Sequence, residues 1–168
     1  MSIHSEHPFA TPPERKVPLR RLRGRVPSPV FVVCTNEGSQ FVGLTVSSVL
    51  FSEGESNSVV LLIDPESALG EQLLEGTRLA MSQLVPGDQH LAEVFAGLAP
   101  APGGTFTVGD WQQTEYGPRL TQRTYCAGTV VSRRELGWSE EIMVKLELVE
   151  VVDGPLLAHF RGRYISLD

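Results

Sequence analysis

Three hydroxyl side chains lie within four positions of the segment GLTVSSVLFSEG, which spans residues 43–54. On a strand, Thr45 and Ser47 point to one face, where both hydroxyls could donate hydrogen bonds to a bound anion. Gly43 has no Cβ, so a ligand could approach the backbone closely. Threonine is also a good strand former, and a pair of serines often marks a strand end. The segment alone therefore leaves an anion site and an ordinary strand end both open.

Two further segments carry polar groups that could contact a ligand. Asp64 can cap a helix whose first position is Pro65, and the N–H groups beside Ser67 would then attract a phosphate. Ser82 and Gln83 stand in an otherwise apolar strand-like run, where a polar side chain needs a partner. Ser67 could instead be only a first-turn residue, and Gln83 could face solvent.

The common catalytic and metal-binding patterns are absent from the sequence. It has no GxSxG, Walker, GxGxxG or HExxH motif. Neither His90 nor His159 has a carboxylate or thiol close in sequence that would suggest a metal site. Cys34 and Cys126 stand in separate apolar runs, which favours two buried free thiols. We therefore expect no metal site.

Basic side chains gather near the N-terminus of an otherwise acidic chain. The formal net charge is -6, yet residues 1–25 have two glutamates and six basic side chains, Arg15, Lys16, Arg20, Arg21, Arg23 and Arg25. Such an arm could bind the phosphate of a nucleic acid or of a small cofactor, or could form a solvated helix face. The acidic remainder, and the lack of aromatic residues within the basic run, disfavour nucleic acid as a partner.

The length and composition fit one domain. The chain has 168 residues, of which 41% are hydrophobic. Residues 1–17 are rich in proline and poor in apolar side chains, which predicts a flexible N-terminal tail before a domain over residues 18–168. No apolar window is long enough to span a membrane, and the N-terminus lacks the apolar core of a secretory signal. We expect a cytoplasmic protein without a membrane partner.

Strands should hold most of the candidate residues. Apolar and β-branched runs, separated by turn-rich segments, predict strands over residues 30–35, 41–48, 58–63, 78–84, 124–136, 141–153 and 156–167. A short basic helix is expected over residues 18–26. Two more helices, over residues 64–76 and 88–97, each begin with an aspartate cap and end at a glycine. Residues 99–118 are expected to be a loop.

The order of these elements predicts the fold class. About seven strands, with two short helices inserted after the third and fourth, favour a closed antiparallel β-barrel over a doubly wound parallel sheet. Every connection is short enough for antiparallel neighbours. We therefore expect a mainly β protein, a barrel with short helices.

Four segments, in order, resemble the flavin reductase-like family over residues 19–167. The opening LRRLRGRVPSPVFVVCTNEGSQFVGLTVSSVLF is similar to the family's Gly-x-Thr-x-Ser-Ser-Phe region. LAMSQLVPGDQHLAEVFAG resembles its Phe-x-Val-Asn-Val-Leu strand and the acidic helix after it, and GPRLTQRTYCAGTVV resembles the strand that follows a Gly-x-Pro. GPLLAHFRGRYISL resembles its closing Pro-Leu-x-x-x-x-Gly-x-Tyr. The resemblance implies a split antiparallel β-barrel of the FMN-binding type, a homodimer that binds FMN or FAD.

The resemblance also implies a role for each candidate residue. The flavin ring edge and ribityl chain would meet Thr45, Val46, Ser47 and Ser48. The phosphate would contact Ser67, and backbone groups lining the isoalloxazine would come from Met81, Ser82 and Gln83. His159 and the turn from Arg161 to Tyr164 would lie near the pocket rim or the subunit interface. NADH or NADPH would pass hydride to the flavin, so no catalytic side chain is required and His159 is the one candidate.

The chain departs from the family pattern where the nicotinamide would bind. The family's Gly-Asp-His before the penultimate strand, whose histidine borders the nicotinamide site, reads GWSEEI here over residues 137–142, so this histidine is missing. Trp138 could take over a stacking role or cover the end of the barrel. The sequence thus predicts an NAD(P)H-dependent flavin reductase that binds flavin at a dimer interface and supplies a monooxygenase or another electron acceptor. The alternative is a flavin-binding electron carrier or flavin store that does not oxidise nicotinamide.

Overall fold

The computed structural model describes residues 18–168, so the predicted tail lies outside the described residues. Every strand pairing among them is antiparallel. The strands are β1 Ser28–Pro29, β2 Phe31–Glu37, β3 Gln40–Val46, β4 Val49–Ser52, β5 Ser58–Ile63, β6 Arg78–Gln83, β7 Trp111–Thr114, β8 Gly117–Leu120, β9 Tyr125–Leu136, β10 Ser139–Glu150, β11 Leu156–Phe160 and β12 Arg163–Leu167. The helices are α1 Pro18–Arg23, α2 Ala68–Gln72, α3 Gln89–Phe95 and the short 3-10 helix η2 Thr105–Thr107.

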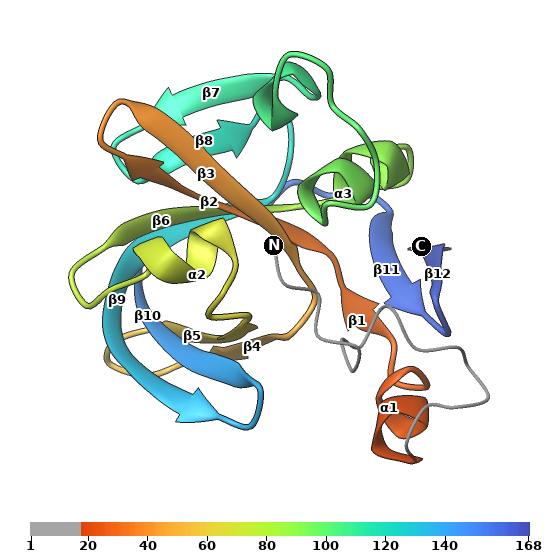
Figure 1. The fold of residues 1–168 in the computed structure, drawn as a ribbon, viewed down its shortest axis with the longest axis horizontal. Helices are drawn as coiled ribbons and strands as arrows, with labels where there is room; N and C mark the ends of the chain where they lie inside the picture. Colours follow the sequence, from red (N-terminus) through yellow and green to blue (C-terminus); the bar gives the residue numbers. More distant parts are fainter. Residues whose placement is uncertain (1–17) are drawn as a thin grey trace.

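A seven-stranded sheet in the order β3-β2-β6-β9-β10-β5-β4 curls into a half-barrel (Figure 1). Its edge strands β3 and β4 are joined by a connection in which the Ser48 carbonyl accepts a hydrogen bond from Leu62 N at 3.2 Å. The two long strands β9 and β10 pair along almost their whole length, with two irregularities in register. Because β3 and β4 do not pair with each other, the barrel is split, as the family resemblance implies, rather than closed.

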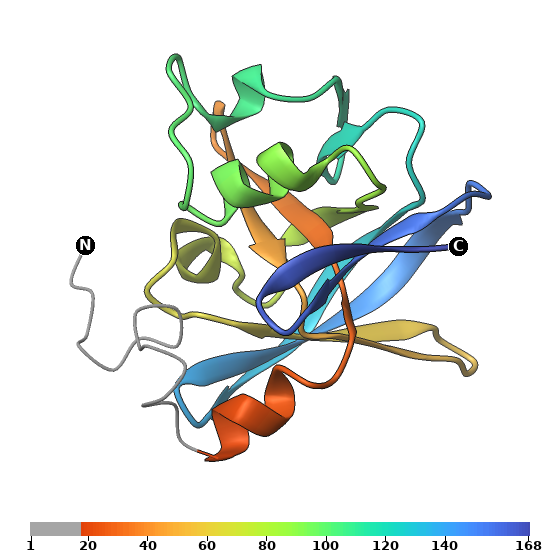
Figure 2. The same cartoon turned by 90° about the vertical axis from the view of Figure 1, so that its right-hand side faces the viewer.

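Apolar side chains fill both faces of this sheet. Inside the curl, α2 contributes Leu69 and Leu73 to a buried cluster that includes side chains from β2, β5, β6, β9 and β10. On the other face, α3 packs Leu91, Val94 and Phe95 against β2, where a second buried cluster forms. The two helices therefore hold the central strands from opposite sides, as Figure 2 shows.

Two small sheets complete the fold. The sheet β1-β11-β12 extends from the start of β2, and its hairpin turn contains Arg161 in a left-handed conformation, with φ of 51°. This sheet is attached to the body by a hydrogen bond of 3.0 Å from Leu157 N to Leu84 O. The hairpin β7-β8 is held by β2 and β6, and Gly117 packs its backbone against Cys34 and Thr35 of β2.

The predicted elements are present, with four corrections. The strand β4 falls in a segment that shows no clear pattern, because only Val49 of its four residues is buried. The helix predicted from Asp64 begins at Ala68, since Ser67 is the residue that caps it. The segment predicted as a loop over residues 99–118 contains η2 and β7, which carry the aromatic side chains Phe106 and Trp111. The last predicted strand is a hairpin, because Arg161 and Gly162 turn the chain back.

Candidate functional site

The curled sheet brings two of the predicted segments together. Phe31 of β2 pairs with Val46 on one side and with Gln83 on the other. Val32 likewise pairs with Thr45 and with Ser82. The ends of β3 and β6 therefore lie one strand apart, at the same end of the half-barrel.

Most side chains predicted to contact a ligand are already engaged by the fold. The Thr45 hydroxyl donates to Ala92 O of α3 at 2.7 Å. The Ser82 hydroxyl is buried and accepts a hydrogen bond from Leu120 N at 2.9 Å, which supplies the partner that its apolar surroundings require. Val46 and Met81 belong to the buried cluster inside the curl. The side chains of these four residues are therefore already engaged within the fold.

The glycine that was expected to let a ligand approach has another role. A Cβ on Gly43 would lie 2.7 Å from Cε1 of Phe95, closer than such atoms ever come. Phe95 also packs on Phe106 and Trp111, with ring centroids 5.0 and 5.3 Å away. Gly43 therefore makes room for an aromatic cluster under α3, and the expectation of a ligand there is wrong.

Ser47 and Ser48 are the two predicted residues whose hydroxyls the fold leaves available. Both are half-buried in the connection between β3 and β4, and neither side chain is hydrogen-bonded to any part of the chain that the structure describes. Just beyond them, Phe51 is 54% exposed and lies against Phe31, with ring centroids 6.0 Å apart. An exposed aromatic ring three residues along the chain from two hydroxyls without a described partner suits a planar ring with polar edges.

Phe51 could not be recognised as a candidate from its sequence context. A phenylalanine in an apolar run is expected in the core, but Phe51 stands on an edge strand where no further strand covers it. The unusual combination of a core-facing position and high exposure is visible only in the fold.

Ser67 caps the turn that lies beside the connection between β3 and β4. Its hydroxyl donates to Asp64 O at 2.7 Å and accepts from Gly70 N at 3.0 Å. The Asp64 carboxylate accepts a hydrogen bond from Glu66 N at 2.9 Å, so the turn is stabilised by hydrogen bonds within the segment itself. The hydrogen bond between Ser48 and Leu62 places this turn close to the two free serines. The Ser67 hydroxyl, which was predicted to contact a phosphate, is thus engaged in the helix cap. The acidic residues Asp64 and Glu66 lie in the same turn.

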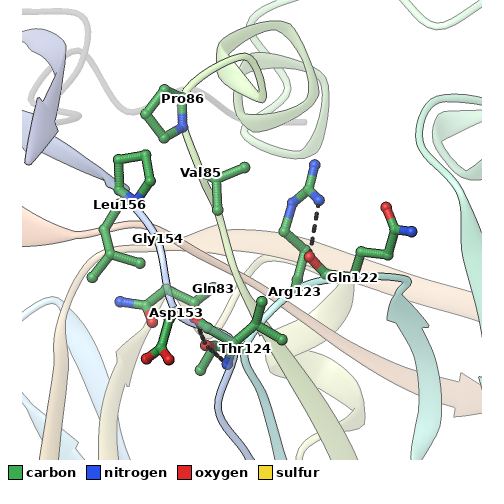
Figure 3. Close-up of a pocket in the computed structure, with 11 residues that line it drawn as sticks. Gln83, Val85, Pro86, Gln122, Arg123, Thr124, Asp153, Gly154 and Leu156 are labelled. Carbon is green, nitrogen blue, oxygen red and sulfur yellow. Dashed lines mark hydrogen bonds between the residues drawn. The ribbon is translucent and has the colours of Figure 1, made fainter. Parts of the chain in front are cut away.

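Gln83 lines a cavity of about 170 Å³ (Figure 3). One wall is formed by Arg123, which donates two hydrogen bonds of 2.8 and 2.9 Å to the Asp88 carboxylate. That pairing raises the pKa of the Arg123 guanidinium. None of the other predicted flavin-contacting residues lines this cavity.

The two remaining candidates stand at the margins of the half-barrel. His159 of β11 is half-buried, pairs with Ser28 and lies with its ring centroid 5.5 Å from that of Tyr164. Trp138, in the turn between β9 and β10, is 83% exposed and therefore does not cover the end of the barrel. Glu140, two residues later, pairs with Ile63, immediately before the turn at Asp64.

The described residues contain no reactive nucleophile or metal cluster among their cysteines and histidines. Cys34 and Cys126 are free and buried, as predicted. Burial raises the pKa of the Cys34 thiol far above its usual range and that of Cys126 to about 12. No three potential metal ligands lie together within residues 18–168, and no helix there is long and apolar enough to cross a membrane.

Comparison with known proteins identifies the fold and its lineage. Residues 23–168 match the model of the flavin reductase like domain, and so nearly the whole described chain is covered. The chain belongs to this family. A comparison with curated protein sequences gives no match.

Solved structures of flavin reductases have the same fold. The NADH:FAD oxidoreductase of Streptomyces globisporus C-1027, in complex with NAD and FAD fragments, is 20% identical, with a TM-score of 0.81 over 94% of this chain and 96% of that one. The flavin reductase component of a bacterial two-component tryptophan halogenase is 20% identical, with a TM-score of 0.77 over 89% and 98%. The styrene monooxygenase flavin reductase of Pseudomonas putida S12 is 15% identical, with a TM-score of 0.79 over 90% and 98%. At these identities, the comparison with the three structures shows that the chain shares their fold.

Proposed function

We propose that this chain is an NAD(P)H-dependent flavin reductase that binds FMN or FAD at the end of the half-barrel beside Ser47 and Ser48. The observation that carries the proposal is the pair of hydroxyls without a described partner, followed three residues later by the exposed ring of Phe51, in a chain of the flavin reductase-like family. Two of the similar structures are reductase components that serve a halogenase and a monooxygenase. We extend this to the present chain, with a monooxygenase as the electron acceptor and the cytoplasm as its location.

The residues present fit a flavin. Hydroxyl groups both donate and accept hydrogen bonds, which matches the mixed donors and acceptors along the edge of an isoalloxazine and on a ribityl chain. The Phe51 ring offers an apolar face for the body of the ring system. A bound flavin would supply the redox chemistry by accepting a hydride equivalent from the reduced nicotinamide.

The protein's part is positioning. Ser47 and Ser48 would fix the in-plane orientation of the ring, while β2 and α3 hold the backbone that carries them. Thr45 stabilises this arrangement through its bond to Ala92 O and not through the ligand. No side chain of the described site has to take up or release a proton, and His159 remains the one candidate for a catalytic side chain.

We further propose that the chain acts as a homodimer. On the outer face of β4, β5 and β10, Leu50 lies beside Val60, and Val60 beside Met143. Leu50 is 74% exposed in the single chain. An apolar row on the outside of a sheet is typical of a surface that another protein covers. A second copy on this face would lie next to β4 and thus close to Phe51.

Flavin binding and nicotinamide oxidation can be tested separately. Quenching of FMN or FAD fluorescence on titration with the protein measures binding, and anaerobic bleaching of the bound flavin by NADH or NADPH measures reduction. Binding followed by bleaching is the expected result. Absence of quenching with both flavins contradicts the proposal.

The second candidate is a flavin carrier or store that does not oxidise nicotinamide. It is favoured by residues 137–139, which read Gly-Trp-Ser where the family pattern has Gly-Asp-His, so that the histidine beside the nicotinamide is missing. Tight flavin binding together with no bleaching by either nicotinamide would select this function over the reductase.

A further inference from the structure

The arginines in the body of the protein are all paired with carboxylates. Between residues 26 and 160 every arginine forms an ion pair, and the pairs are Arg78–Glu115, Arg119–Glu150, Arg123–Asp88, Arg133–Glu140 and Arg134–Glu141. Their positive charges are therefore neutralised locally and offer little to a ligand.

The arginines at the two ends of the described chain are different. Five exposed side chains have no carboxylate partner within residues 18–168, and we call them the arginine patch: Arg21, Arg23, Arg25, Arg161 and Arg163. They come from α1 and the residues just after it, and from the β11–β12 turn and the start of β12. These two segments are joined by a hydrogen bond of 2.8 Å from Arg161 N to Gly24 O. Figures 1 and 2 both show α1 next to that turn.

The arginine patch lies at the same end of the half-barrel as the two free serines. From α1 the chain passes through β1 into Phe31, and Phe31 pairs with Val46, the residue before Ser47. Both views show the connection between β3 and β4 running beside β1 (Figures 1 and 2). A ligand extending from Ser47 past β1 would approach α1.

The candidate site itself has no basic side chain. Residues 43–51, 64–67 and 81–83 contain no lysine or arginine, and the turn at Ser67 adds the carboxylates of Asp64 and Glu66. A nicotinamide dinucleotide carries two bridging phosphates, and NADPH carries a third as a 2′-phosphate dianion. Guanidinium groups bind such oxygens through paired, charge-assisted hydrogen bonds.

We infer that the arginine patch binds the adenosine-side phosphates of the nicotinamide dinucleotide and thereby favours NADPH over NADH. The inference rests on the proposed function, because it assigns the patch to the co-substrate of the same site. The five arginines, which have no carboxylate partner within residues 18–168, exceed the two negative charges of the bridging phosphates of NADH, and the 2′-phosphate dianion of NADPH raises the negative charge to four. An extended nucleic acid fits less well, because the remainder of the chain is acidic and would repel it.

The test is calorimetric titration of the full chain, loaded with flavin, with NADP⁺, NAD⁺ and 2′,5′-ADP. We expect the wild type to bind NADP⁺ and 2′,5′-ADP more tightly than NAD⁺. The double variant Arg23→Gln/Arg163→Gln should weaken NADP⁺ and 2′,5′-ADP binding roughly tenfold, as expected for the loss of charge-assisted contacts at an exposed site. NAD⁺ binding should change less, and added salt should weaken NADP⁺ binding in the wild type more than in the variant.

The matched control is Arg78→Gln, which removes an exposed arginine at the opposite end of β6 from Gln83. It should leave all three affinities unchanged, and thermal unfolding should show all variants to be folded. Equal binding of NADP⁺ by wild type and double variant overturns the inference, as does equal binding of NADP⁺ and NAD⁺ by the wild type.

The two proposals fail in distinguishable ways. If neither NADH nor NADPH reduces the flavin, the reductase function fails, while loss of 2′,5′-ADP binding in the double variant still supports a phosphate site. If reduction proceeds with unchanged NADPH affinity in the variant, the function stands and the arginine patch has another role. Tighter binding of a single-stranded oligonucleotide than of 2′,5′-ADP, lost in the double variant, overturns the inference in favour of nucleic acid.

Discussion

Removing the Thr45 hydroxyl should lower the stability of the fold, whereas removing the Ser47 and Ser48 hydroxyls should weaken flavin binding. Thr45→Val should lower the free energy of unfolding by about 1 kcal/mol, because it removes a hydrogen bond to Ala92 O and leaves that carbonyl unsatisfied. Its effect on flavin affinity should be small. Ser47→Ala/Ser48→Ala should leave the free energy of unfolding unchanged, because these hydroxyls have no partner among the described residues to lose. The double variant should instead weaken flavin binding.

The size of the effect on affinity follows from two hydrogen bonds. At about 0.5–1.5 kcal/mol for each bond, the double serine variant should bind flavin roughly 5- to 150-fold more weakly. Fluorescence titration with FMN and FAD measures the affinity, and urea unfolding monitored by circular dichroism measures the stability. Ser52→Ala, an exposed serine on β4, is the matched control and should change neither quantity.

One result would refute this reasoning. If Thr45→Val weakened flavin binding as much as the double serine variant and left stability unchanged, the Thr45 hydroxyl would belong to the ligand and not to α3. Equal flavin affinity in the wild type and the double serine variant would equally contradict the placement of the ring beside Ser47.

Three more changes test the packing, the hairpin and the dimer. Gly43→Ala should destabilise the fold by about 1–3 kcal/mol in urea unfolding, because its Cβ meets the Phe95 ring, and Phe95→Leu in the same chain should recover part of the loss. Trp138→Ala should raise the KM for the nicotinamide several-fold with little change in kcat, whereas Trp138→Phe should retain stacking; equal KM values in all three proteins would exclude a stacking role. Leu50→Asp should halve the mass measured by light scattering, while Leu74→Asp, exposed at the end of α2, should leave it unchanged.

The architecture could be predicted from local sequence patterns because most of its strands and helices are marked by them. β-branched runs such as the one at Val59 to Ile63 and the glycine at position 97 define strands and a helix end before any contact is known. The strand β4 could not be found in this way, because it is stabilised by pairing with β5 and not by burial of its own side chains.

The site was predictable only as a set of segments. Thr45, Ser47 and Ser82 look alike in sequence, since each is a hydroxyl in an apolar run. What separates them is a partner far along the chain: Ala92 O for Thr45, Leu120 N for Ser82 and no described group for Ser47. The sequence predicts Asp64 as the helix cap, but the structure has Ser67 in that position. The reason is again a contact made in the fold, because Gly70 packs tightly against Asp64 O and the helix begins one turn later.

The burial of both cysteines affects how readily their thiols are oxidised. Reduced flavin reacts with molecular oxygen to give hydrogen peroxide, and a thiol is oxidised by peroxide through its thiolate form. With the pKa of Cys126 raised to about 12 and that of Cys34 higher still, almost no thiolate exists at neutral pH. If the chain reduces flavin in air, as we propose, its two buried thiols offer the peroxide almost no thiolate to oxidise.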